Sequence, residues 1–332
     1  MKTSDRLQDY YPFPADIVER VSEVADYQAA MDYRDFFNGL GVPDVIKYDP
    51  KFSSSIDVLD IRPKRGHYGS QTQVLHLPHG NGLDPNMVYH AATIFAADPS
   101  VRTIAVGNPS RPGIKGGRLN HDERKIVASG NLRPTVEGVL DYLETNKIAE
   151  ATHIGWSYGA DKAVAAAKYA EKFDQKVVQT ISIEPAAIAA RGLVRLSRQF
   201  LKTGKYLQNY VEATELKAFM AARKNSVGLA AYGLALLRPT NFAIACALAK
   251  DGFEGHANEA LLKQPEMKLD MVWGKESELA THGLMYAITM RLADKYNVDP
   301  NFRVGGTWLK SQYHNWTNDI HLLTATIIDA KA

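Results

Sequence analysis

The distribution of apolar residues along this chain predicts an α/β fold, a mostly parallel sheet with helices on both faces. Two observations support this prediction. From residue 55 onward, short β-prone runs alternate with segments of helical periodicity. Between one such run and a helical segment stands Gly-Trp-Ser-Tyr-Gly at 155–159, which predicts a sharp turn at the carboxyl end of a strand.

The composition excludes several classes of protein. Among the 332 residues, 39 basic and 37 acidic side chains give a formal net charge of +2, which argues against a nucleic-acid-binding protein. The single cysteine, Cys246, rules out an internal disulfide bond and a cysteine-based zinc site. The N-terminal residues lack the apolar segment of a signal peptide, so we expect a cytoplasmic protein.

One stretch, residues 227–249, is apolar enough to resemble a membrane segment. It is interrupted by Arg-Pro-Thr-Asn at 238–241, which leaves two runs that are each too short to span a bilayer. We therefore expect two buried helices joined by a turn and no membrane span.

Residues 1–54 precede the expected core and form an N-terminal extension. Apolar residues recur at helical spacing between Asp16 and Tyr33, and glycine and proline at 39–43 end that pattern. The extension is therefore expected to be partly helical, and no chemistry is assigned to it.

The core begins with alternating apolar runs at 56–61 and 74–77, which predict two strands and an antiparallel start to the sheet. The second run ends at a glycine-rich corner, 78–82. The elements then expected before the 155–159 turn are a helix at 85–97, a strand at 101–106, a loop rich in glycine and proline at 107–117, a helix at 135–146 and a strand that ends at the turn.

Beyond the turn, the pattern predicts two halves of the core separated by a helical insertion. The expected elements are a helix at 163–172, strands at 177–183, 267–273 and 302–309, and helices at 281–296 and 319–330. Residues 186–265 show helical periodicity without a strand and predict a cap or lid. The core accordingly comprises residues 55–185 and 266–332.

The 155–159 turn places Ser157 where its hydroxyl would project from the carboxyl end of the sheet. A sharp turn there strains the backbone and requires small neighbours, which Gly155 and Gly159 provide. The helix behind it directs free N–H groups and its positive dipole end toward the serine, and Asp161 is expected to serve that N-terminus. Strand, Gly-x-Ser-x-Gly and helix together form a nucleophile elbow, and here the sequence resembles the α/β-hydrolase superfamily.

The resemblance covers roughly residues 55–185 and 266–332 and implies a catalytic triad in the order serine, acid, histidine. It makes Ser157 the nucleophile and His314 the base, because His314 follows the last expected strand and precedes the last expected helix. His321, within that helix, is the alternative. His282 begins the preceding helix and is expected to be a surface or capping residue.

Three residues remain candidates for the acid of the triad. Glu278 follows the 267–273 strand and takes the acid's place in a Gly-x-x-Ser-Asp-type ending, so it is the preferred choice. In the commoner Gly-x-x-Asp form the acid would fall at Ser277, which cannot serve. Glu184 ends the 177–183 strand, where a minority of the superfamily carries its acid, and Glu276 is a third candidate.

The resemblance also implies an oxyanion hole formed by two backbone N–H groups. One belongs to Tyr158, the residue after the nucleophile. The other comes from the loop after the 74–77 strand, where Asn81 is preferred and Gly82 is the alternative. Each such donor stabilises an acyl-transfer transition state by roughly 2.7–4 kcal/mol.

The expected function is that of a serine hydrolase that cleaves a carboxylic ester or related acyl substrate through an acyl-enzyme, with Ser157, His314 and Glu278 as its triad. No cofactor or metal is implied. Apolar residues at 229–237 suggest a partly apolar small-molecule substrate.

Other chemistry of the same triad (thioester or carbon–carbon hydrolysis, acyl transfer, cofactor-free haloperoxidation) is an alternative. A non-catalytic ligand-binding module is another, favoured only by the unsettled acid.

Overall fold

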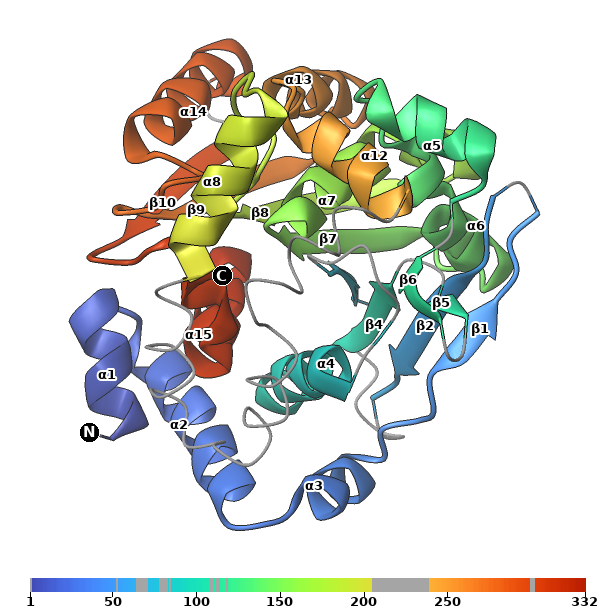
Figure 1. The fold of residues 1–332 in the computed structure, drawn as a ribbon. Coiled ribbons are helices and arrows are strands. Elements are labelled where there is room, and N and C mark those ends of the chain that lie inside the picture. Colours follow the sequence, from blue (N-terminus) through green and yellow to red (C-terminus); the bar gives the residue numbers. More distant parts are fainter. Residues whose placement is uncertain are drawn as a thin grey trace.

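Within the residues that the structure describes, the sheet contains eight strands in the order β1-β2-β4-β3-β7-β8-β9-β10 (Figure 1). The computed structural model describes residues 2–51, 53–63, 71–77, 83, 85–107, 110–111, 114–117, 119–204, 239–298 and 302–332. The strands are β1 (Ile46–Tyr48), β2 (Ile56–Ile61), β3 (Thr72–His76), β4 (Arg102–Gly107), β7 (Glu150–Trp156), β8 (Lys176–Ile183), β9 (Lys268–Gly274) and β10 (Val304–Leu309).

Most of the sheet is parallel, as the sequence predicts. Strand β2 is antiparallel to both β1 and β4, and every pair from β4 to β10 is parallel. The sheet therefore has an antiparallel start. However, the two strands expected to form it, at 56–61 and 74–77, are not neighbours, because β4 lies between β2 and β3. The order of strands along a chain does not fix their order in space when helices connect them.

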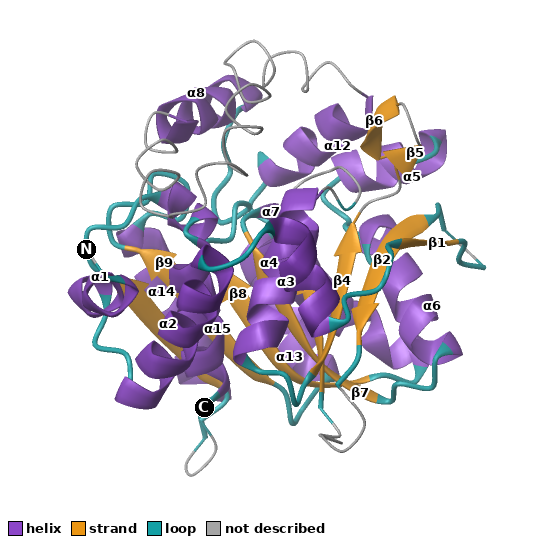
Figure 2. Ribbon diagram, turned by 90° about the horizontal axis from the view of Figure 1, so that it is seen from below, coloured by secondary structure: helices purple, strands orange, loops and turns teal. Residues whose placement is uncertain are grey.

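Helices cover both faces of the sheet (Figure 2). The α-helices are α1 (Thr3–Tyr10), α2 (Ala15–Ala29), α3 (Tyr33–Leu40), α4 (Pro85–Ala97), α5 (His121–Ala128), α6 (Glu137–Thr145), α7 (Tyr158–Tyr169), α8 (Leu193–Gly204), α12 (Pro239–Leu248), α13 (Phe253–Lys263), α14 (His282–Tyr296) and α15 (Ile320–Lys331). Three 3₁₀ turns, η1 (Arg133–Thr135), η2 (Ala170–Phe173) and η3 (His314–Asn318), and a small hairpin of β5 (Ser110–Arg111) and β6 (Ile114–Gly117) complete the described elements.

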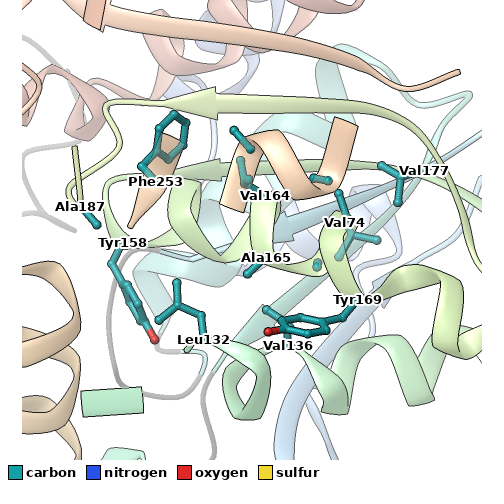
Figure 3. Close-up of a cluster of buried hydrophobic side chains, with 14 of the residues drawn as sticks. Val74, Leu132, Val136, Tyr158, Val164, Ala165, Tyr169, Val177, Ala187 and Phe253 are labelled. Atoms are coloured by element: carbon teal, nitrogen blue, oxygen red, sulfur yellow. The ribbon is translucent and has the colours of Figure 1, made fainter. Parts of the chain in front are cut away.

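The two faces carry separate apolar clusters, because successive strand residues point to opposite sides. Val74 and Ile104 belong to the cluster beneath α6, α7, α13 and α14, whereas the next residues, Leu75 and Ala105, belong to the cluster beneath α2, α4 and α15. Figure 3 shows part of the first cluster, in which Phe253 of α13 lies close to α7. Because side chains on both faces are buried, the strands appear in the sequence as almost continuous apolar runs.

The helices of the N-terminal extension pack on the helices α4 and α15 that cover one face of the sheet. Helices α1 and α2 lie beside α15 (Figure 1), and Leu7 and Ile17 are buried in the same cluster as Ile327. A buried ion pair between Arg6 and Asp319 links α1 to the start of α15. The extension also contributes the edge strand β1, which the sequence pattern does not predict.

The range expected as a cap, 186–265, includes a helix of the core. Helix α13 directly precedes β9 and packs on α7 through residues such as Ala257, which is completely buried. Residues 205–238 of the expected cap, with the apolar segment 229–237, lie outside the described residues. Within the described ranges, none of the helices has the length and apolarity needed to cross a bilayer.

Candidate active site

Ser157 lies at the turn between β7 and α7 in a backbone conformation that few residues adopt. Its φ is 53° and its ψ is −129°, a strained combination found mainly at functional sites. A Cβ atom at Gly155 would overlap the carbonyl of Gly159, and one at Gly159 would overlap the carbonyl of His76. Both glycines are therefore needed so that α7 can approach the sheet closely enough to form the turn.

His314 is the side chain that contacts the serine hydroxyl. The Oγ atom of Ser157 is 3.0 Å from Nε2 of His314, the first residue of η3. The Nδ1 atom of the same ring is 3.0 Å from Oε2 of Glu184. A carboxylate only accepts hydrogen bonds, so Nδ1 carries the proton and Nε2 of the neutral ring is free to accept from Ser157.

Glu184 follows directly after β8 and is completely buried, with a φ of 53°. Its Oε1 atom accepts the backbone N–H of Gly274 at 2.5 Å and the indole N–H of Trp316 at 2.8 Å. Its Oε2 atom accepts the hydroxyl of Ser277 at 2.6 Å in addition to Nδ1 of His314. These four donors satisfy both oxygens of the buried carboxylate, and a buried polar group without such partners would be costly.

The preferred acid of the sequence analysis, Glu278, does not contact His314. Its Oε2 atom is buried with no hydrogen-bond partner among the described residues, and its carbonyl accepts from Gln199 of α8. Glu276 is exposed. The geometry thus favours the alternative acid, Glu184. Strands β8 and β9 are parallel neighbours, so their carboxyl ends meet at the same edge, and the side chain from β8 occupies the place beside the histidine.

The two proposed oxyanion donors differ in what the structure describes. Tyr158 is the first residue of α7, so its backbone N–H belongs to the free donors of a helix N-terminus. Its ring is 2% exposed and lies near Leu132 in the cluster of Figure 3, so it packs into the core. Asn81 and its alternative, Gly82, lie outside the described residues.

Other histidines considered from the sequence lie away from the serine. The Nδ1 atom of His282 accepts the indole N–H of Trp273 at 2.9 Å. His321 is buried in α15, where its Nε2 atom is 2.8 Å from the Gln28 side chain, and burial lowers its pKa to about 3.

Asp161 was expected to serve the N-terminus of its own helix, and it also binds the segment after the acid. Its carboxylate accepts the backbone N–H groups of Ala186 and Ala187, at 3.0 and 3.2 Å. The side chain is almost completely buried, and burial raises its pKa to about 7. Asp161 thus holds the chain immediately beyond Glu184 against α7.

The donors that hold Glu184 were not predicted from the sequence. Ser277 was noted only as unable to act as an acid, and Trp316 was not considered. Ser277 stands where the commoner form of the motif places its acid, which was a signal that this position lies close to the contact between acid and histidine.

Comparisons with solved structures agree with this architecture. An esterase from Pyrococcus furiosus has a TM-score of 0.56 at 10% identity, covering 89% of this chain and 92% of its own. An enol-lactonase from Burkholderia xenovorans has a TM-score of 0.52 at 14% identity (86% and 98%), and naproxen esterase from Bacillus subtilis one of 0.51 at 13% (97% and 100%). No protein-family model and no curated protein sequence matches the chain.

These likenesses and the strand order identify the protein as one with the α/β-hydrolase fold. The fold class predicted from the nucleophile elbow and the alternation of strands and helices is confirmed.

Proposed function

We propose that this protein is a serine hydrolase that cleaves a carboxylic ester or a related acyl bond. The observation that carries the proposal is the unbroken series of contacts from Ser157 through His314 to Glu184. A serine hydroxyl is a weak nucleophile by itself and becomes reactive when a base that a third group orients accepts its proton. A protein that only binds a ligand would not need this arrangement. The uncertainty about the acid was the one feature that favoured such a protein, and Glu184 is now a candidate for the acid beside His314.

In the proposed reaction, Ser157 Oγ forms a bond to the substrate carbonyl carbon while its proton passes to Nε2 of His314. Glu184 stabilises the resulting imidazolium through Nδ1. The carbonyl oxygen becomes an oxyanion, for which the backbone N–H of Tyr158 and, from the sequence, that of Asn81 are the proposed donors. As the carbon–oxygen bond breaks, His314 returns the proton to the departing alcohol, leaving an acyl-Ser157 ester.

Water completes the cycle. His314 accepts a proton from the water as it attacks the acyl-Ser157 carbonyl, and the proton then passes to Ser157 Oγ as the carboxylic acid departs. The similar solved structures are those of two esterases and an enol-lactonase. Their names support a small-molecule substrate with an acyl–oxygen bond for this chain. Thioester hydrolysis and acyl transfer to another acceptor would use the same three side chains.

A panel of p-nitrophenyl esters and thioesters of increasing acyl length tests this proposal. Wild-type protein should hydrolyse at least one class, and Ser157→Ala and His314→Ala should each reduce kcat/KM by more than about 10³-fold. Folding of both variants is checked by circular dichroism. Hydrolysis that persists unchanged in folded Ser157→Ala would contradict the proposal.

A further inference from the structure

Ser277 lies in the loop after β9, and its hydroxyl contacts the acid of the proposed triad. The side chain is 5% exposed, and its Oγ atom is 2.6 Å from Oε2 of Glu184. That oxygen is the one that faces Nδ1 of His314. Ser277 is therefore one contact removed from the imidazole that would move the proton.

The direction of this hydrogen bond is fixed by a second contact. The backbone N–H of Ala280 is 3.1 Å from Ser277 Oγ and can only donate, so it occupies a lone pair of the hydroxyl oxygen. The carboxylate of Glu184 can only accept. The single hydroxyl hydrogen of Ser277 must then point at Oε2 of Glu184.

The loop that presents this hydroxyl is held in place by its backbone. Ser277 N–H donates to the carbonyl of Gly274 at 3.1 Å, and Gly274 N–H donates to the other oxygen of Glu184. The N–H of Glu276 donates to the carbonyl of Gln312, two residues before the histidine, at 3.0 Å. The same short loop thus contacts both the acid and the segment that leads to His314.

The two carboxylate oxygens have different surroundings. Gly274 and Trp316 both donate to Oε1, whereas Oε2 receives Ser277 and His314. Without the Ser277 hydroxyl, the imidazole of His314 itself would be the one described donor to Oε2. Apart from the ring that it orients, the carboxylate would then be held only by the two described donors to Oε1.

We propose that Ser277 is a positioning residue of the triad, whose hydroxyl keeps Oε2 of Glu184 directed at Nδ1 of His314. This inference rests on the proposed function. Ser277 acts through Glu184 and touches no reacting atom, so its removal should slow the chemical step without weakening substrate binding.

The experiment compares Ser277→Ala with a matched control, Ser182→Ala. Ser182 is a fully buried serine of β8, and its hydroxyl has no hydrogen-bond partner among the described residues. Both variants are assayed in the full-length protein for kcat and KM on an ester that wild type hydrolyses, and for thermal unfolding. We expect Ser277→Ala to lower kcat about 10- to 100-fold with KM nearly unchanged, and Ser182→Ala to stay within about twofold.

Two further variants separate positioning from a general structural role. In a Glu184→Gln background, Ser277→Ala should have little additional effect on kcat, because the residue through which it acts is already altered. Ser277→Cys preserves the side-chain shape but supplies only a weak S–H donor, so it should fall between wild type and Ser277→Ala. This variant keeps the test open if Ser277→Ala fails to fold.

The outcomes distinguish this inference from the function on which it rests. If wild type neither hydrolyses esters nor reacts with a fluorophosphonate at Ser157, the proposed function fails. If wild type is active and folded Ser277→Ala and Ser277→Cys retain its kcat, only the role of Ser277 is overturned. An equal loss of kcat in both backgrounds would also overturn it, since that is the result of an effect independent of Glu184.

Discussion

The carboxyl ends of β8 and β9 lie side by side, and each is followed by a glutamate that could have served as the acid. Glu184, after β8, is completely buried and accepts hydrogen bonds from four groups. Glu278, after β9, is partly exposed, and its buried Oε2 has no partner among the described residues. The hydrogen-bond donors around a carboxylate, more than its place in the motif, therefore decide which acid can act beside the histidine.

The largest expected effect comes from exchanging these two acids for amides. Glu184→Gln should lower kcat/KM about 10⁴-fold, because an amide cannot stabilise the imidazolium and can favour the wrong histidine tautomer. Glu278→Gln should remain within about twofold. Steady-state kinetics on a common ester measure both effects. A larger loss in Glu278→Gln than in Glu184→Gln would show that Glu278 is the acid.

The next largest effect concerns burial of charge at the N-terminal extension. Arg6 and Asp319 form an ion pair whose side chains are 5% and 0% exposed, whereas the pair of Arg20 and Asp16 is exposed. Arg6→Ala leaves a buried carboxylate without its charged partner and should lower the free energy of unfolding by about 3–5 kcal/mol. Arg20→Ala should cost less than about 0.5 kcal/mol.

Urea unfolding of the two arginine variants measures this contrast. Similar midpoints for Arg6→Ala and wild type would mean that α1 is not held to α15 through this pair.

A smaller effect is expected when a methyl group is added at the elbow. In Gly159→Ala the new Cβ would overlap the carbonyl of His76, so backbone must move, at a cost of roughly 1–3 kcal/mol or more. Gly192→Ala is the matched control, because no atom of the described residues lies within 4 Å of its new Cβ. Thermal unfolding compares them, and equal stability would indicate that α7 can shift without penalty.

The last prediction concerns pH and the buried histidines. Burial lowers the pKa of His153 to about 4 and that of His321 to about 3, from an ordinary value of 6.5. Between these pH values the unfolded chain therefore binds protons that the folded chain does not. The free energy of unfolding falls as pH falls from about 6.5 toward 4. Each such histidine contributes a slope of up to about 1.4 kcal/mol per pH unit.

Replacement of one buried histidine should flatten that dependence. His153→Gln should reduce the slope of unfolding free energy between pH 6.5 and 4, whereas the change His121→Gln, at an exposed position, should not. Urea titrations at several pH values provide the slopes, and an unaltered slope in His153→Gln would contradict the assignment of a neutral buried imidazole.

Features encoded in local sequence could be predicted well. The helix expected at 85–97 and the strand at 56–61 coincide with α4 and β2, because their periodicity and flanking residues are local. Ser157 could be placed on its turn, and His314 after the last strand, for the same reason. Short, exposed β1 has no such pattern and was missed.

Features that depend on distant parts of the chain could not be predicted. The insertion of β4 between β2 and β3 depends on how connecting helices return the chain to the sheet. The choice of Glu184 depends on Gly274 at the end of β9, Ser277 in the loop that follows, and Trp316 in η3. A search along the sequence lists candidate acids, but only the fold brings these donors to one of them.

Reaction with a fluorophosphonate probe measures whether Ser157 is activated by His314 and Glu184. Intact mass and peptide mapping should reveal one adduct on Ser157, absent in Ser157→Ala and formed much more slowly in Glu184→Gln. Glu278→Gln should react at the wild-type rate. Folded wild-type protein that forms no adduct, or forms one at another residue, would show that Ser157 is not activated by His314 and Glu184.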